Sequence, residues 1–244
     1  MEHVRKKENE KMKITYWSDY ACPYCYIAEA RLEKAIKALG MEDKIEIEMK
    51  SFELDPTASK NVVSSTIERF ARKYRMTEQM AAVQIEQISQ LGRAEGIDFN
   101  YVSTQYTNTM DAHRLTKLAQ SKENSILAAK VKKALYDAYF TKNMELSDRK
   151  TLLQIAIDAG MDLKEVEDLL DGEQYVEDVR RDERQAEQYG IHGVPFFIVG
   201  EKYSISGAQS EEGFIKTIKK VLEENSLSVT EQAASCGIDG CQIR

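Results

Sequence analysis

The sequence predicts an α/β fold that a long all-helical segment interrupts. Strand-like alternation of apolar and polar residues occurs only near the two ends of the chain, around residues 14–18, 45–50 and 195–206. Residues 64–172 show helical periodicity throughout, and the 244 residues include only three prolines. We therefore expect the strand-bearing segments to form one structure, with the helical segment inserted between them.

The first strand-bearing segment predicts a β-α-β unit. Residues 14–18 are β-prone, and residues 23–39 place their apolar side chains on one face of a helix. Residues 45–50 alternate isoleucine or methionine with glutamate or lysine, which is typical of a strand with one solvated face. Asp55-Pro56 ends this unit.

The middle of the chain predicts helix after helix. Apolar residues at helical spacing mark one face with Met80, Val83, Ile88 and Leu91, and similar patterns follow over residues 126–139 and 152–159. This segment is too long and too apolar for a loop. It is therefore expected to pack as a helical subdomain of its own.

The second strand-bearing segment predicts α-β-β-α. A charged helix over residues 175–189 precedes a buried type of strand over 195–199, a two-residue turn at Gly200-Glu201 and a return strand over 202–206. A last amphipathic helix carries apolar residues from Phe214 to Leu222. With the helical segment removed, the order of elements is thioredoxin-like.

This order sets the expected domain boundaries. Residues 13–56 and 175–224 are expected to form a discontinuous thioredoxin-like domain, and residues 57–174 an inserted helical subdomain. Residues 225–244 are expected to form a flexible C-terminal tail.

Charge and hydropathy narrow the range of partners. The net charge of −7 comes with no basic stripe, so nucleic acid is not an expected partner. No apolar run approaches the roughly 18–20 residues that span a bilayer. Residues 1–11 are charged and lack the apolar core of a secretory signal peptide. A cytoplasmic protein is the expectation that follows.

The chemistry is expected at Cys22-Pro23-Tyr24-Cys25, which follows a strand and opens a helix. The unpaired N–H groups of a helix N-terminus favour a thiolate at Cys22, and Pro23 suits the first helical position. Cys25 lies one turn further, within reach for a disulfide. A redox-active pair is the interpretation that this context favours. Half of a zinc site and an incidental cysteine pair are the alternatives.

Gly193-Val194-Pro195 precedes the predicted hairpin. In a thioredoxin-like order, a cis-proline at this point lies against the two cysteines. A cis Val194–Pro195 bond would leave the backbone of Val194 free to pair with an extended substrate. The alternative is a proline that merely begins an edge strand.

Four ordered stretches resemble one family, spanning nearly all of residues 13–224: Trp17-Ser-Asp-Tyr-Ala-Cys-Pro-Tyr-Cys-Tyr26, Asn108-Thr-Met-Asp-Ala-His-Arg-Leu115, Gly190-Ile-His-Gly-Val-Pro-Phe-Phe197 and Ile205-Ser-Gly-Ala-Gln209. The chain resembles the DsbA family, and within it the FrnE-like branch. This resemblance implies a thioredoxin fold with an inserted helical domain and disulfide exchange without a bound cofactor. It also implies that Cys22 attacks and Cys25 resolves.

Two details qualify the resemblance. The Pro23-Tyr24 dipeptide differs from the Pro-His of the periplasmic oxidants, so the resemblance does not carry over their strongly oxidising potential. His113 lies in the second stretch, and the resemblance suggests that it faces the cleft and contacts substrate. A lone histidine on an apolar helix face is also a common structural residue.

A second cysteine pair lies in the tail, at Cys236 and Cys241. A redox pair that exchanges with Cys22–Cys25 is the first hypothesis for it. A local disulfide clip is the second, and a four-thiolate metal site shared with Cys22 and Cys25 is the third.

The sequence therefore predicts a thiol–disulfide oxidoreductase acting on protein or small thiols and disulfides. Neither a bound cofactor nor a metal is expected, and glutathione is a candidate electron donor or acceptor. A zinc-binding or redox-sensing interaction protein is one alternative. The other is a glutathione-dependent enzyme like the kappa-type transferases and chromene-carboxylate isomerases, which share this fold. Those enzymes typically use a single serine or cysteine, so Cys25 argues against them.

Overall fold

The computed structural model describes residues 11–234, with side chains for residues 11–224. Four strands form one mixed sheet in the order β2-β1-β3-β4. They are β1 (Met12–Ser18), β2 (Ile45–Ser51), β3 (Phe196–Val199) and β4 (Tyr203–Ser206). β1 pairs parallel with β2 and antiparallel with β3, and β3 pairs antiparallel with β4.

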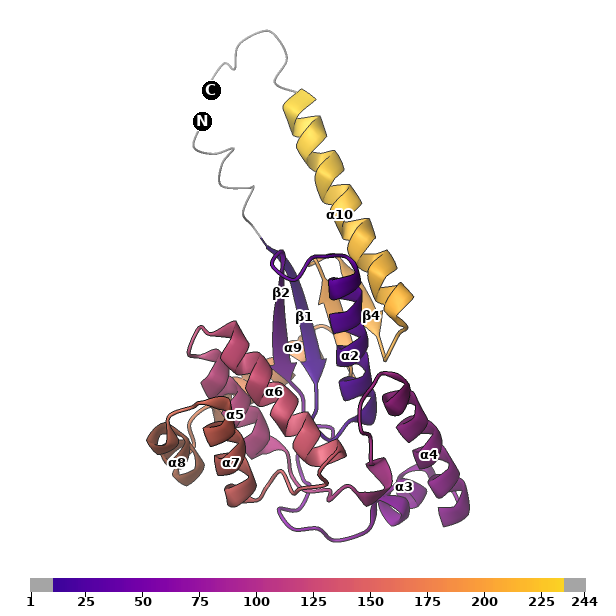
Figure 1. Ribbon diagram of the computed structural model, residues 1–244, viewed down its shortest axis with the longest axis vertical. Coiled ribbons are helices and arrows are strands. Elements are labelled where there is room, and N and C mark those ends of the chain that lie inside the picture. Colours follow the sequence, from indigo (N-terminus) through magenta and orange to yellow (C-terminus); the bar gives the residue numbers. More distant parts are fainter. Residues whose placement is uncertain (1–10, 235–244) are drawn as a thin grey trace.

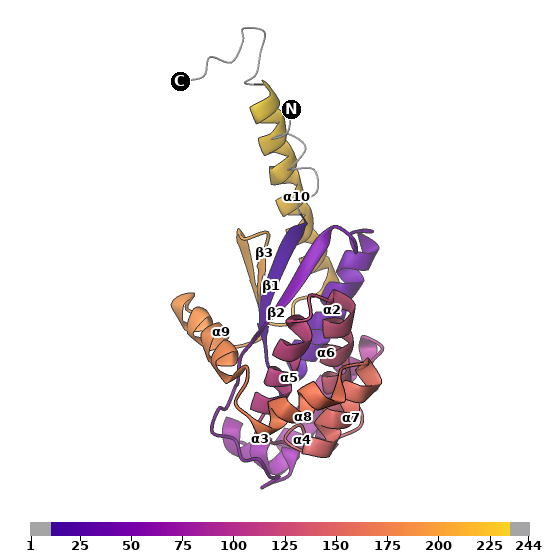
Figure 2. The ribbon, with the colours of Figure 1, turned by 90° about the vertical axis from the view of Figure 1, so that its left-hand side faces the viewer.

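Helices cover both faces of this sheet. α2 (Pro23–Ala38) and α10 (Glu211–Ala234) pack against each other on one face, and α9 (Val176–Gln188) lies on the opposite face (Figure 2). The central strand β1 supplies side chains to both layers. Tyr16 stacks on Phe197 with 5.2 Å between ring centroids, while Trp17 donates a hydrogen bond to the carbonyl of Asp182 on α9 at 2.9 Å.

The remaining helices lie together at the end of the sheet where β1 and β2 finish (Figure 1). They are α3 (Thr66–Tyr74), α4 (Glu78–Ala94), the 3₁₀ turn η1 (Tyr101–Ser103), α5 (Met110–Gln120), α6 (Ser125–Phe140), α7 (Arg149–Ala159) and α8 (Leu163–Asp171). Side-chain caps begin most of them. Ser65 and Glu68 form a capping box at α3, and Asp148 and Asp162 accept backbone N–H bonds at α7 and α8.

One contiguous cluster of buried apolar side chains runs from the sheet into the helical insertion. Tyr26 of α2 stacks on Tyr136 of α6, with ring centroids 4.8 Å apart and planes 3° from parallel. Tyr136 also packs on Tyr20, beyond the end of β1. The thioredoxin-like fold with a helical insertion is therefore confirmed, and the insertion shares its core with the sheet. The residue boundaries of the two domains stay a prediction.

The structure corrects three local expectations. Met80 and Val83 are 54% and 59% exposed, because the buried face of α4 is another one, with Ala81, Ile85, Ile88 and Gly92 facing inward. The hairpin connection has three residues, Gly200 to Lys202, since Val199 pairs with Tyr203. The backbone of α10 continues to Ala234, beyond the end expected near Leu222.

Candidate active site

Cys22 occupies the N-cap of α2, with extended backbone angles (φ −91°, ψ 113°) and Pro23 beginning the helix. Its backbone N–H donates to the carbonyl of Asp19 at 3.1 Å, which fixes the turn between β1 and the helix. The side chain is only 4% exposed, yet it lies in the wall of a cavity. The helix N-terminus therefore holds this sulfur in the wall of an open cavity, where a substrate can reach it.

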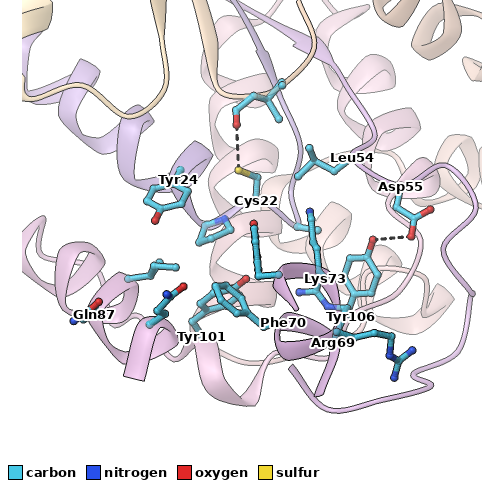
Figure 3. A pocket seen from close by; sticks show the side chains of 18 of the residues that line it. Cys22, Tyr24, Leu54, Asp55, Arg69, Phe70, Lys73, Gln87, Tyr101 and Tyr106 are labelled. Atoms are coloured by element: carbon cyan, nitrogen blue, oxygen red, sulfur yellow. Dashed lines mark hydrogen bonds between the residues drawn. The ribbon is translucent and has the colours of Figure 1, made fainter. Parts of the chain in front are cut away.

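The loop before β3 closes over the same sulfur. The Val194–Pro195 peptide bond is cis. The thiol of Cys22 donates to the carbonyl oxygen of Val194 at 3.5 Å, joining residues 172 positions apart (Figure 3). Pro195 accepts a backbone bond from Gly207 at 2.9 Å, which ties this loop to the end of β4. The structure thus brings together the two segments that the sequence singled out.

Cys25 lies one turn along α2, behind Cys22, and is 1% exposed. Both cysteines are free thiols. Burial raises the pKa of Cys25 well above its usual range, and the neighbouring Cys22 adds to this rise. Hydrogen bonds from the Ser18 hydroxyl and the Asp19 backbone act in the opposite direction. Between the two cysteines, Tyr24 is partly exposed and lines the cavity.

A polar cluster, composed of Asp19, Glu53 and His113, is buried near the cysteine pair. Nε2 of His113 lies 3.4 Å from Oδ1 of Asp19, whose carboxylate also accepts backbone bonds from Ala21 at 3.3 Å and Leu54 at 2.8 Å. Burial raises the pKa of Glu53, while the charges of His113 and Arg180 lower it. The cluster combines an acid, a base and a second acid in a poorly solvated place.

His113 is fully buried, and neither ring nitrogen has a hydrogen-bond partner among the described residues. Its ring packs on Tyr20, and it does not line the cavity at Cys22. The structure therefore places it behind the active site, because this face of α5 packs on Asp19 and Tyr20, just after β1. A substrate contact by His113 stays a prediction.

The cavity at Cys22 has a volume of about 860 Å³. One wall is the cysteine loop with Val194, and the other belongs to the insertion: Arg69, Phe70, Lys73 and Tyr101 face Cys22 across the opening (Figure 3). Sequence reasoning missed this wall, because charged residues on a helix surface normally indicate a solvated face. It also missed Ser18 and Asp19, whose only signal was proximity to Cys22.

Over the part of the chain that the structure describes, no cluster of three or more His, Cys, Asp or Glu side chains is arranged to hold a metal ion. Within that same part, no helix has the length and apolar character needed to cross a membrane. Cys236 and Cys241 lie outside the described residues.

Comparisons with known proteins find relatives of the whole fold. A probable DsbA oxidoreductase from Streptomyces coelicolor has a similar structure, with a TM-score of 0.82 and 34% identity, covering 87% of this chain and 91% of that one. The uncharacterised protein YwbO of Bacillus subtilis is 26% identical over 84% of this chain and 94% of its own length.

A 2-hydroxychromene-2-carboxylate isomerase shares the fold at 14% identity and a TM-score of 0.61, covering 93% of this chain and 100% of that one. The FrnE-like branch stays a prediction. The sequence matches the DSBA-like thioredoxin domain over residues 13–219, and the chain therefore belongs to that family.

Proposed function

We propose that this chain catalyses thiol–disulfide exchange, with Cys22 as the attacking thiol and Cys25 as the resolving thiol. The observation that carries the proposal is the placement of the two sulfurs. Cys22 caps α2 at the wall of an open cavity, and Cys25 is sealed one turn behind it. An accessible sulfur suits the thiol that meets substrate, and a shielded sulfur suits the thiol that acts second.

The reaction balances in two steps. The thiolate of Cys22 attacks a substrate disulfide, forms a mixed disulfide and releases one substrate sulfur as a thiolate, which takes up a proton. Cys25 then loses its proton and attacks the sulfur of Cys22, releasing the second substrate sulfur. The substrate disulfide is reduced to two thiols, and the cysteine pair is oxidised to a disulfide. Run in reverse, the same steps oxidise a substrate dithiol.

Protein segments and small thiols are both proposed as substrates, with glutathione as a candidate electron donor or acceptor. The support is the form of the site. Val194 presents its backbone beside Cys22, which suits an extended peptide. The cavity of about 860 Å³ is also large enough for a small disulfide.

Two alternative functions remain open to experiment. An isomerase or transferase of the chromene-carboxylate type is disfavoured by Cys25, since a single nucleophile suffices for such enzymes. A zinc protein would need ligands beyond Cys22 and Cys25, for example Cys236 and Cys241. Metal content of the purified, reduced protein tests the zinc alternative directly.

Single-cysteine variants test the proposed roles. Cys25→Ser is expected to accumulate mixed disulfides with substrate, because nothing resolves them. Cys22→Ser is expected to lose rapid alkylation by iodoacetamide at about pH 6, followed by peptide mass spectrometry apart from Cys236 and Cys241, since buried Cys25 is a poor nucleophile there. Equal alkylation rates for the two variants would contradict the assignment. The reduction potential of the pair then decides between a reductase or isomerase and an oxidant.

We also infer that Cys236 and Cys241 form a second redox pair, which exchanges disulfides with Cys22–Cys25. We infer as well that the protein is cytoplasmic. The test compares the full chain with a chain that ends at Ala234, which leaves α10 complete. Mass spectrometry in glutathione buffers follows each pair. If truncation leaves the potential and turnover of Cys22–Cys25 unchanged, and no disulfide links the pairs, a local clip is the better interpretation.

A further inference from the structure

The cavity at Cys22 has a positively charged wall that the exchange of the two cysteines does not by itself require. Arg69, Arg72 and Lys73, all on α3, line the same cavity as Cys22. Arg69 and Lys73 are labelled in Figure 3. Among the described residues around this cavity, Asp55 supplies the one carboxylate. The whole chain carries a net charge of −7, so a local excess of cations beside the reactive sulfur runs against its overall charge.

These cations form no ion pair within the described part of the protein, although Arg72 lies in the field of Glu68 on the same helix. None of the three contacts a carboxylate there, whereas almost every other described arginine does. The single other exception, Arg75, caps the same helix. Arg72 and Lys73 in the last turn complement the helix dipole, but Arg69 lies further from that end and gains less from it. The charge on this wall is therefore left to attract an anion from solution.

Arg69 is the most constrained of the three. Its Nε and Nη2 atoms are buried and have no hydrogen-bond partner among the residues that the structure describes. Its guanidinium lies over the ring of Tyr106, 3.9 Å from the ring centroid. Such stacking holds the guanidinium in place, and partial desolvation strengthens its attraction for a negative charge. A guanidinium held without a counter-ion costs stability, and a bound anion would offset that cost.

The rest of the cavity suits the uncharged part of the same ligand. Phe70, Tyr101 and Ile88 provide apolar and aromatic surface between the cationic wall and the cysteine loop. A ligand that presents sulfur to Cys22 can therefore rest on these rings while its charged groups reach α3.

We propose that the preferred substrate is an anionic disulfide, one whose groups next to the sulfurs carry carboxylates. This inference rests on the proposed function and specifies its substrate class. The chemistry has two sources, a small molecule such as glutathione disulfide or an acidic segment of a protein. In either case the substrate disulfide is reduced to two thiols, and Cys22 and Cys25 are oxidised to a disulfide.

The test measures single-turnover oxidation of the reduced full-length protein by three small disulfides. Glutathione disulfide is anionic, hydroxyethyl disulfide is neutral and cystamine is cationic. Acid quenching, alkylation and peptide mass spectrometry follow Cys22–Cys25 separately from the tail cysteines. Each rate is divided by the rate of the same disulfide with dithiothreitol, which removes intrinsic reactivity. The expected order is anionic, neutral, cationic, and the preference should shrink as ionic strength rises.

Charge-removing variants locate the preference. Arg72→Gln and Lys73→Gln, both at exposed positions, should each slow the oxidation of Cys22–Cys25 by glutathione disulfide about two- to fivefold, as expected for exposed charges. Arg69→Gln should slow it by about tenfold, because its charge is partly desolvated. Hydroxyethyl disulfide should react with these variants as with the parent, which also shows that they fold. Arg75→Gln is the matched control, since it removes an unpaired cation of the same helix outside the cavity wall, and it should change neither rate.

The outcomes separate this inference from the proposed function. If no disulfide oxidises the cysteine pair, the proposed function fails. If all three react at equal corrected rates, or if the variants slow neutral and anionic disulfides alike, this inference is overturned while the function stands.

Disulfide-linked octapeptides with flanking aspartates or lysines identify the source. An acidic peptide faster than glutathione disulfide indicates protein segments, and the reverse order indicates a small molecule. A lysine-flanked peptide that matches the acidic one would overturn the inference.

Discussion

Replacing Ser18 by alanine should slow the second step of exchange and leave the first step intact. Ser18 ends β1 and is fully buried. Its hydroxyl forms a hydrogen bond with the sulfur of Cys25, which opposes the rise that burial imposes on the pKa of that thiol. The same hydroxyl lies 2.6 Å from the hydroxyl of Tyr136 on α6. Without it, the pKa of Cys25 should rise further, and less thiolate will be present at a given pH.

The size of the effect follows from the kind of bond removed. A hydrogen bond to a charged group contributes about 1.5–3 kcal/mol. If it stabilises the Cys25 thiolate by that amount, its loss should slow resolution by roughly ten- to a hundredfold near neutral pH. The variant should also lose about 1–3 kcal/mol of stability, because the buried hydroxyl of Tyr136 is left without this partner. Tyr136→Phe is the control, since it keeps the Ser18 hydroxyl free to donate to Cys25.

Ellman's reagent separates the two steps in a full-length background with Cys236→Ser and Cys241→Ser. The first release of chromophore reports attack by Cys22, and the second reports resolution by Cys25. Because the pKa of Cys25 is raised, the second rate should climb about tenfold per pH unit across the neutral range. Ser18→Ala should slow only this second phase. An unchanged second phase, or one that does not depend on pH, would refute the reasoning.

Three other outcomes are expected. Glu29 and Lys132 form a buried ion pair at 2.5 Å. Glu29→Gln or Lys132→Met alone should therefore lower the free energy of unfolding in urea by about 3–5 kcal/mol, and the double variant should lose less than the sum of the two. Additive losses would count against coupling between the two side chains. Gly92→Ala should lower the free energy of unfolding by about 1–3 kcal/mol, since the new Cβ would lie 2.5 Å from Cγ of Phe99. An unchanged urea midpoint would contradict this. Burial raises the pKa of Cys25 in the folded protein above its unfolded value of about 8.5. The protonated thiol therefore adds its full stability below about pH 8.5, and this stability is lost as the pH rises further. The reduced protein should therefore unfold at lower urea above about pH 9, and Cys25→Ala should lessen that decline.

Much of this site could be predicted because its signals are local. Strand alternation before Cys22 and helical spacing after it place the cysteine at a helix N-cap, and Pro23 belongs at the first helical position for a reason confined to its own backbone. The same holds for the order of elements, since each strand or helix is marked by its own periodicity.

The helical insertion was predictable as helix but not as surface. Periodicity alone assigned Met80, Val83, Ile88 and Leu91 to one buried face of α4; Ile88 is buried, and the other three are exposed. The buried face combines Ile85 and Ile88 with small residues, and at Gly92 the helix backbone lies close against the ring of Phe99. Which face a helix buries depends on the shape of what it meets, and no local pattern contains that shape.

By itself, the sequence determined the family of the fold, the position of Cys22 at a helix start and the place of Cys25 one turn behind it, because those depend on residues a few positions apart. Only the tertiary structure decided what surrounds the two sulfurs. The loop before β3 brings Val194 to the site, α6 brings Tyr136 and α3 brings Arg69. Their contacts at the site join segments that are far apart in the chain. Packing sets those contacts, because burial and desolvation act on the folded molecule as a whole.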